Sequence, residues 1–271
     1  MPAYRLTLEY EGTRFRGWQE QKNAPLTVMG ALRRAVVEVA GTDPGGGAGL
    51  GGSGRTDAGV HALGQVAHLR LPRPVDPERF AAEVNERLPA DVHLLSMRPA
   101  PERFHARHDA TSRAYLYQVS RRRTGLAKRF VWWVRRPLDA AAMARAAAAI
   151  PGRHDFRHFA ADPEGRRSEK KSTVVVVEAA QIATAGELVL VRVVASHFLW
   201  KMVRRLTGVL VEVGAGTFSP EDFAALLEPG SGPPPIVPAE HTAPPSGLFL
   251  ERVLYPGDPP LAPPAPAFPV R

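Results

Sequence analysis

The sequence contains no cysteine among its 271 residues. Disulfide bonds, thiolate zinc sites and cysteine nucleophiles are therefore excluded. No apolar run approaches the ~20 residues that a membrane-spanning helix needs. The first residues enter an alternating apolar and polar pattern at once, without the apolar core of a signal peptide. We therefore expect a cytoplasmic protein with no membrane partner.

Sequence motifs for a cofactor or a metal are also missing. The glycine run over 45–54 is not followed by the Gly-Lys-Ser/Thr of a phosphate-binding loop. Nine histidines are present, but they are scattered along the chain. His61 stands four residues after Asp57, and no second carboxylate or cysteine completes a ligand set there. We expect neither a cofactor nor a metal.

Acidic residues are fewer than basic ones. Lys and Arg number 35 against 27 Asp and Glu, which gives a formal net charge of +8. A surplus of this sign suggests a polyanionic partner, either nucleic acid or an anionic membrane surface. A sequence that is simply rich in arginine would show the same surplus. Composition alone therefore does not distinguish a polyanionic partner from a general richness in arginine.

Apolar periodicity predicts strands and helices in a regular order in the first part of the chain. The expected elements are a strand over 4–10, a helix over 28–40, a weak strand near 45–54, a strand over 65–71, a helix that begins at Pro77 after the cap Asp76, and a strand over 92–97. This order is that of the ferredoxin-like βαββαβ arrangement.

A similar order recurs in the second part of the chain. Expected there are strands over 115–119, 130–134, 173–177, 188–194 and 248–254, and helices capped by Asp139, Ser196 and Ser219. We therefore expect an α+β fold of two ferredoxin-like halves side by side, with antiparallel sheets and a central basic cleft. The expected divisions are residues 1–104, residues 105–255 and a tail over 256–271. Seven of the sixteen tail residues are proline, so we expect the tail to be disordered.

The stretch from Gly52 to Ala62 reads Gly-Ser-Gly-Arg-Thr-Asp-Ala-Gly-Val-His-Ala. Its glycines allow backbone angles closed to other residues and let a ligand approach the main chain. Its one carboxylate, Asp57, follows Arg55 by two positions, and a neighbouring cation favours the charged form of a carboxylate. Covalent catalysis by aspartate needs such a group. The simpler interpretation is a glycine turn with a surface ion pair.

Two later segments combine aromatic or basic side chains with regular spacing. Tyr115 and Tyr117 point to the same face of their expected strand, where an aromatic ring could stack on an extruded base or pack in the core. In the expected helix from Ser196, an apolar stripe opposes a polar side that suits a close approach to a phosphate backbone or faces water. That polar side consists of Lys201, Arg204, Arg205 and Gly208.

The string around Asp57 resembles the signature of the TruA family of tRNA pseudouridine synthases. The resemblance extends from Tyr10-Glu11-Gly12-Thr13 to the segment 243–248. It implies that Asp57 is catalytic, that Tyr115 stacks on the target uracil, and that Arg55 and Arg204 support the carboxylate. The further residues expected to contact RNA are Arg55, Phe104, His105, Ala106, Arg107, His108, Arg123, Arg166, Arg167, Lys201 and Arg205.

The family resemblance implies an isomerase that converts uridine to pseudouridine at positions 38, 39 and 40 of the tRNA anticodon stem-loop. It also implies a homodimer. Asp57 could attack the sugar C1′, attack the base C6, or promote glycosidic cleavage by another route. Two other functions fit the residues less well: a non-catalytic RNA-binding protein with tandem RRM-like folds, and a metal-dependent nuclease.

Overall fold

A computed structural model of the chain describes residues 1–21, 26–45, 47, 49–161, 172–228 and 236–270. The chain forms two compact units: unit 1 consists of residues 1–111 and 249–259, and unit 2 of residues 112–248 and 260–271. The first boundary therefore lies at residue 111, where the sequence suggested 104. Residues 249–259 belong to unit 1 because Phe249 and Leu250 pair in parallel with His61 and Ala62.

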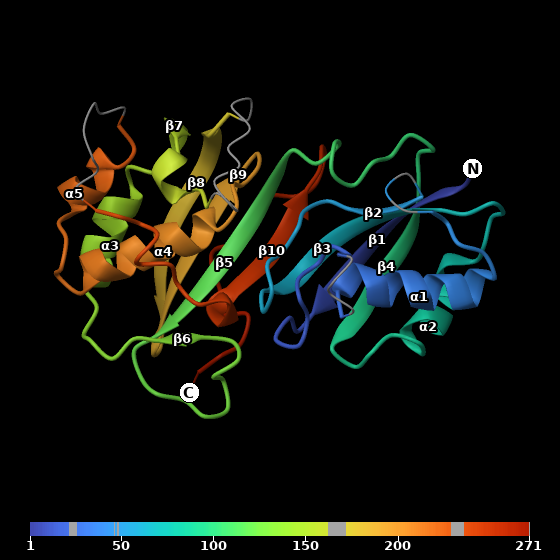
Figure 1. Cartoon of the computed structure of the whole chain (residues 1–271), viewed down its shortest axis with the longest axis horizontal. Helices are drawn as coiled ribbons and strands as arrows, with labels where there is room; N and C mark the ends of the chain where they lie inside the picture. Colours follow the sequence, from blue (N-terminus) through green and yellow to red (C-terminus); the bar gives the residue numbers. More distant parts are fainter. Residues whose placement is uncertain (22–25, 46, 48, 162–171, 229–235, 271) are drawn as a thin grey trace. The chain divides into compact units, whose positions relative to one another are not determined.

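Unit 1 is a sheet with two helices on one face (Figure 1). Its strands lie in the order β4-β1-β3-β10, and β2 also pairs with β3. Strand β1 is antiparallel to both β3 and β4. The elements are β1 (Ala3–Tyr10), α1 (Val28–Ala40), β2 (Leu50–Gly52), β3 (His61–Arg70), α2 (Pro77–Asn85), β4 (Val92–Ala100) and β10 (Leu248–Leu254), whose first residue belongs to unit 2.

Local signals in the sequence account for the two helices of unit 1. The Thr27 side chain accepts a hydrogen bond from the Gly30 amide at the start of α1, and Gly41 ends the helix with φ 65°. Asp76 caps α2 in the same way, and Pro77 occupies its first turn. Both helices therefore begin at the residues that the sequence predicts.

The glycine run contains a strand of only three residues, β2. Its glycines are required by close approaches of other side chains. A Cβ at Gly51 would lie 2.7 Å from the His68 ring, and one at Gly52 would lie 2.5 Å from the Trp18 ring. The weak strand expected here is present. It is rich in glycine because the rings of His68 and Trp18 leave no room for side chains at its last two residues.

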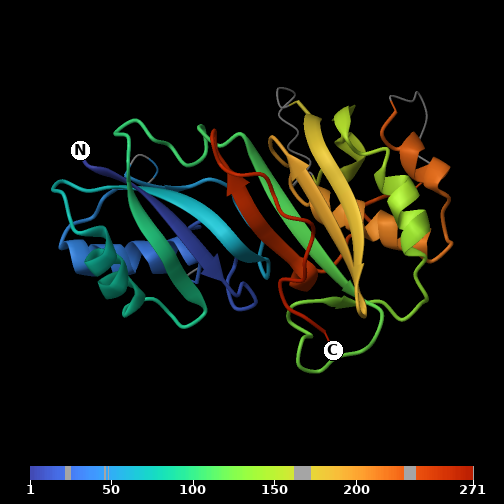
Figure 2. The ribbon, with the colours of Figure 1, turned by 180° about the vertical axis from the view of Figure 1, so that it is seen from behind.

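Unit 2 has strands in the order β5-β9-β8-β7, with β6 parallel to β5. The pairs β5–β9, β9–β8 and β8–β7 are antiparallel. Figure 2 shows β8 and β9 in front of the helices of this unit. The elements are β5 (Ser112–Ser120), β6 (Trp132–Trp133), α3 (Ala140–Ala147), β7 (Gly152–Asp155), η1 (Arg157–Phe159), β8 (Val174–Ala185), β9 (Leu188–Ala195), α4 (Met202–Gly214), α5 (Pro220–Ala225) and η3 (Pro245–Gly247).

The mixed α+β class and the largely antiparallel pairing of the strands are confirmed, but several boundaries differ from expectation. Strand β3 begins at His61, four residues before the expected start, and β8 continues to Ala185. Strand β7 was not predicted. The apolar pattern misses these extensions because they are paired through the backbone, as in the ladder of Gly152–Asp155 with Val174–Val177.

The proline-rich segment after residue 255 contains no helix or strand over its described residues, but its residues from 260 onward form part of unit 2. Val270 is buried in an apolar cluster with Leu116 and Leu190. The backbone amides of Ala267 and Phe268 donate to Gln118 Oε1 at 2.7 and 3.2 Å. The expectation of a disordered tail was therefore wrong, because Val270 is buried and Gln118 binds the backbone of residues 267 and 268.

Across the described parts of the chain, no helix has the length and apolar character that crossing a membrane would require.

Candidate active site

Asp57 lies on a tight turn between β2 and β3. The Val60 amide donates to the Asp57 carbonyl at 3.2 Å, and Gly59 within the turn has φ 79°, an angle that favours glycine. Asp57 is half-buried and Arg55 is exposed. The backbone of the turn is thus held in place while both charged residues retain solvent-accessible surface.

The loop after β1 packs directly on this turn. A Cβ at Gly12 would lie 1.9 Å from the Val60 carbonyl oxygen, and one at Gly17, where φ is 99°, would lie 2.6 Å from the Thr56 carbonyl oxygen. The Trp18 amide donates to that same Thr56 oxygen at 3.1 Å. Two segments that are distant in the sequence therefore form one structural element around Asp57, and the glycines permit their contact.

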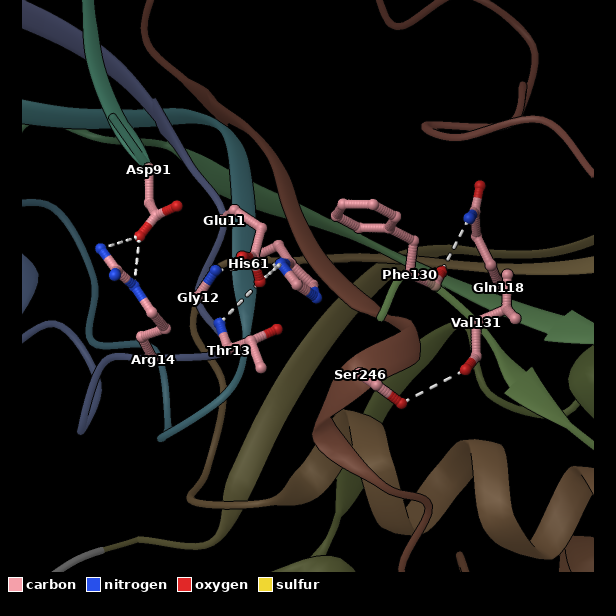
Figure 3. A network of polar contacts seen from close by, with 10 residues as sticks. All are labelled: Glu11, Gly12, Thr13, Arg14, His61, Asp91, Gln118, Phe130, Val131 and Ser246. Carbon is pink, nitrogen blue, oxygen red and sulfur yellow. Dashed lines mark hydrogen bonds and ion pairs between the residues drawn. The ribbon is translucent and has the colours of Figure 1, made fainter. Parts of the chain in front are cut away.

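Further contacts hold the loop after β1 at its other end (Figure 3). The Gly12 amide donates to His61 Nδ1 at 3.0 Å. Because this nitrogen accepts a hydrogen bond, it carries no proton and the His61 ring is neutral. The carboxylate oxygen Oε1 of Glu11, 3.8 Å from the same nitrogen, therefore does not face a charged imidazolium. Arg14 Nε donates to Asp91 Oδ2 at 2.6 Å. Within the described residues, no cluster of three His, Cys, Asp or Glu could hold a metal.

The segment 104–108 packs against β3 and against Tyr255, the residue that follows β10. The His105 ring lies 4.4 Å from the ring of His68 and 4.2 Å from that of His108. The Ala106 amide donates to His68 Nδ1 at 3.2 Å, and the Ala106 carbonyl accepts from the Tyr255 hydroxyl at 2.6 Å. Burial lowers the pKa of His68 to about 4.

The residues of this segment that were expected to contact RNA differ in how exposed they are. Ala106 is fully buried, so its methyl group offers no surface to RNA, contrary to expectation. Arg107 and His108 are exposed. Phe104 is half-buried, with its ring 5.5 Å from the ring of Tyr255. The surface of the segment is thus formed by its charged and aromatic members.

Tyr115 of β5 is 8% exposed, where the sequence left open either an exposed ring that stacks on a base or a ring packed in the core. Its ring meets that of Phe198 edge to face, with centroids 4.9 Å apart at 80°. Tyr117 is fully buried and its hydroxyl donates to the Pro244 carbonyl at 2.7 Å. The two tyrosines share one strand, but their hydroxyl groups and rings have different surroundings.

The helix expected from Ser196 begins at Met202 instead. Lys201 precedes it with φ 59°, the only positive φ of a non-glycine residue in the described chain. The Ser196 hydroxyl does not cap a helix, because it lies 3.1 Å from His197 Nδ1 and 3.5 Å from the Val176 carbonyl. Phe198 therefore lies in the segment before α4 and reaches Tyr115 from there.

The polar side of α4 contacts other parts of unit 2, where the sequence left open either an approach to a phosphate backbone or a face toward water. Gly208 is buried, and a Cβ there would lie 1.4 Å from the His241 carbonyl oxygen. Arg205 Nη1 donates to the Ala160 carbonyl, and burial lowers the pKa of Arg205. The close approach at Gly208 is thus made by the protein's own backbone, which corrects the phosphate interpretation for Gly208.

The remaining basic candidates of unit 2 have different surroundings. Lys201 Nζ lies 4.8 Å from the ring centroid of Trp200, which is 44% exposed. The exposed Arg123 lies over the Trp133 ring at 5.7 Å. Arg166 and Arg167 fall in 162–171, outside the described residues. Lys201 and Arg123 are thus basic residues beside aromatic rings.

A family model described as tRNA pseudouridine synthase matches residues 7–109 and 146–256. The chain belongs to this family. The matched ranges of the pseudouridine synthase model include the Asp57 turn, the loop that covers it, and helix α4. The family resemblance noted from the Asp57 string is therefore confirmed.

Relatives named tRNA pseudouridine synthase A align with nearly the whole chain. The protein of Paramagnetospirillum magneticum is 40% identical over 263 residues, which cover 94% of this chain and 96% of the relative. That of Maricaulis maris is 40% identical over 262 residues, covering 95% and 99%. That of Syntrophotalea carbinolica is 41% identical over 257 residues, covering 94% and 97%.

Sequence reasoning missed the buried polar residues beneath Asp57. Tyr10 Oη lies 2.8 Å from Thr56 Oγ1, and Gln65 Nε2 donates to the Gly54 carbonyl at 3.1 Å. The signal in the sequence that could have revealed these residues is a polar side chain at an inward-facing position of each strand. Tyr10 continues the buried alternation of β1, and Gln65 is fully buried in β3.

Proposed function

We propose that this pseudouridine synthase isomerises uridine to pseudouridine in tRNA and that the carboxylate of Asp57 performs the chemistry. The observation that supports this role most directly is the Asp57 turn itself. Its backbone is bound from one side by Trp18 and closed on the other by Val60, and Asp57 is not fully buried. A nucleophilic or electrostatic carboxylate needs such a fixed and accessible position.

The proposed reaction requires no external reactant. The bond between N1 of uracil and C1′ of ribose breaks, and a bond between C5 and C1′ forms. The proton at C5 leaves and N1 gains a proton, so atoms and electrons balance without an oxidant or a reductant. The target uridine must leave its stack to reach Asp57, which costs a few kcal/mol and least in a loop or at a weakened pair.

This cost favours a stem-loop substrate, and we propose positions 38, 39 and 40 of the anticodon stem-loop from the family resemblance. The same resemblance supports a homodimer, and a tRNA substrate fits a cytoplasmic location. For individual residues, we propose that Tyr115 stacks on the target base and that Arg55 and Arg204 stabilise the charge of Asp57. Arg107, His108, Arg123 and Lys201 are proposed to contact the RNA.

The decisive experiment replaces Asp57 by Asn, which changes almost no volume. Unmodified tRNA that carries tritium at uridine C5 reports each new C5–C1′ bond, because the tritium is released to water. We expect Asp57→Asn to bind tRNA normally and to lose several orders of magnitude in tritium release. Asp43→Asn is the matched control, since Asp43 pairs with Arg33 on the surface. Mapping of pseudouridine in the same tRNA identifies the modified positions.

Activity of Asp57→Asn close to that of the unchanged protein would reject this mechanism. Loss of tRNA binding together with activity would make Asp57 a binding or structural residue. That outcome would favour the non-catalytic RNA-binding alternative, although family membership supports an enzyme.

A further inference from the structure

Three buried polar side chains lie beneath the Asp57 turn. Tyr10 in β1, Gln65 in β3 and Thr56 in the turn are 4%, 0% and 6% exposed. Tyr10 Oη lies 2.8 Å from Thr56 Oγ1 and 3.5 Å from Gln65 Nε2. Gln65 Nε2 also donates to the Gly54 carbonyl at 3.1 Å. The three side chains thus connect two strands of the sheet to the turn.

The groups involved fix the direction of one of these hydrogen bonds. An amide nitrogen can only donate, so Tyr10 Oη accepts from Gln65, while in the bond between Tyr10 and Thr56 either hydroxyl group can be the donor. Burial raises the pKa of Tyr10 well above its ordinary value, so its hydroxyl keeps its proton. Hydrogen bonds in a low-dielectric interior are strong when all groups are satisfied. The network therefore favours one arrangement of the turn.

The network holds the turn on both sides of Arg55. The Gly54 carbonyl precedes Arg55, and the Thr56 hydroxyl follows it and adjoins Asp57. The backbone carbonyl of Thr56 is held separately by the Trp18 amide at 3.1 Å. Asp57 therefore follows a residue that is fixed through both its side chain and its main chain.

The pairing of β1 with β3 also changes at this point. Leu8 is paired with Gln65, whereas Tyr10 is paired with Ala62, so the register shifts between Leu8 and Tyr10. Irregularities of this kind redirect side chains and are frequent next to active sites. Apolar side chains would fill the same space without the cost of burying polar groups. Packing alone therefore does not explain the choice of residues.

We propose that Tyr10, Gln65 and Thr56 are positioning residues that hold the Asp57 carboxylate in its reactive place. This inference rests on the proposed catalytic role of Asp57. A misplacement of about 1 Å can cost about 100-fold in rate. The three residues act through the turn and do not touch the reacting atoms.

The test compares variants that delete single hydroxyl groups. Tyr10→Phe and Thr56→Val remove the hydrogen bond, whereas Thr56→Ser keeps a hydroxyl. Tyr4→Phe is the matched control, because Tyr4 is a buried tyrosine on the same face of β1. Its hydroxyl accepts from the Val75 amide at 2.9 Å, away from the Asp57 turn. For each variant, single-turnover tritium release, tRNA affinity and melting temperature are measured.

We expect Tyr10→Phe and Thr56→Val to slow single turnover by 10- to 100-fold, with tRNA affinity changed less than twofold. Thr56→Ser should remain within about threefold of the unchanged protein, and Tyr4→Phe should keep its rate even where its melting temperature falls. Single-turnover rates of Tyr10→Phe and Thr56→Val within twofold of the unchanged protein would overturn the inference. A loss of rate in Tyr4→Phe as large as that in Tyr10→Phe would overturn it too. If Tyr10→Phe does not fold, the comparison of Thr56→Val with Thr56→Ser decides.

These outcomes are distinct from failure of the proposed function. If Asp57→Asn is inactive while the hydroxyl variants turn over normally, the carboxylate is essential but the network does not position it. If Asp57→Asn is active, the catalytic role of Asp57 itself is wrong.

Discussion

Arg204 and Ala243 are joined by two reciprocal hydrogen bonds. Arg204 Nε donates to the Ala243 carbonyl at 2.7 Å, and the Ala243 amide donates to the Arg204 carbonyl at 3.1 Å. Ala243 is fully buried. The arginine of α4 thus holds the segment that leads into η3 and β10, in addition to the charge-stabilising role that we propose for it.

Replacing Arg204 separates these two roles. Arg204→Gln keeps an amide donor that can reach the Ala243 carbonyl, but it removes the positive charge. We expect a loss of at least tenfold in tritium release and a loss of less than about 1 kcal/mol in the free energy of unfolding. Arg204→Ala should lose both, because a buried carbonyl then lacks its donor. Normal turnover by Arg204→Gln would leave the arginine with a structural role only.

Tyr115 and Tyr117 should respond differently to substitution. Tyr115→Phe keeps the ring and should retain much of the turnover, whereas Tyr115→Ala should lose roughly 1–3 kcal/mol of base stacking. Tyr117→Phe removes the donor to the Pro244 carbonyl, and we expect it to reduce stability by about 1–3 kcal/mol without slowing the folded enzyme. The measurements are single-turnover rate and urea unfolding. Tyr115→Ala that folds and turns over normally would reject the stacking role.

Lys201 and Arg205 should differ in how they affect the salt dependence of tRNA binding. The logarithm of affinity falls with the logarithm of salt by about 0.7–0.9 per phosphate neutralised. Lys201→Ala should reduce this slope by about one unit. Arg205→Ala should leave it unchanged, because Arg205 Nη1 is bound to the Ala160 carbonyl. Filter binding at several salt concentrations measures both slopes, and an unchanged slope in Lys201→Ala would exclude its phosphate contact.

Acidic conditions should destabilise unit 1 through His68. Its pKa is about 4 in the folded protein because of burial, against about 6.5 when unfolded. The unfolded chain therefore binds the proton first, and stability present above pH 6.5 is lost as the pH falls toward 4. The loss is up to roughly 3 kcal/mol. Burial also lowers the pKa of the neighbouring His105, so its contribution has the same sign.

The measurement for His68 is urea unfolding between pH 7 and pH 4.5. His68→Gln should flatten this dependence, since glutamine does not titrate. Arg70 and Asp109 also act on the charge of His68, and both remain in the variant. An identical pH dependence in His68→Gln would show that the effect arises elsewhere.

The C-terminal segment should contribute to the stability of unit 2. Deletion of residues 260–271 removes Val270 from its apolar cluster and removes the partners of Gln118 Oε1. It also removes the Ala262 carbonyl, which accepts from Arg192 Nη1 at 2.6 Å. Gln118 and Arg192 are buried, so we expect a loss of several kcal/mol in the free energy of unfolding.

Phe268→Ala provides the graded comparison for this deletion. It removes the ring stacked on Phe130 at 4.6 Å but keeps the backbone amides, and its effect on thermal unfolding should be smaller. An unchanged melting temperature after the deletion would contradict the packed arrangement. The side-chain amide of Gln118 also donates to the Phe130 carbonyl at 2.9 Å, as Figure 3 shows.

The sequence alone determined the elements that depend on short-range interactions. The caps Asp76, Asp139 and Ser219 each bond an amide within three residues, so the starts of their helices could be predicted. The string around Asp57 is also local, and it indicated the family before any contact was known.

Only the tertiary structure decided the features that depend on distant partners. Ser196 resembles a helix cap, yet its hydroxyl interacts with Val176 and His197. Gly208 among basic residues suggested a phosphate contact, yet the space beside it is occupied by the backbone of His241. The contact of Tyr10 with Thr56 spans 46 residues of chain. The hydrogen-bond partner of such a side chain is set by the tertiary fold, which brings distant residues together. The pattern of neighbouring residues in the sequence therefore does not predict it.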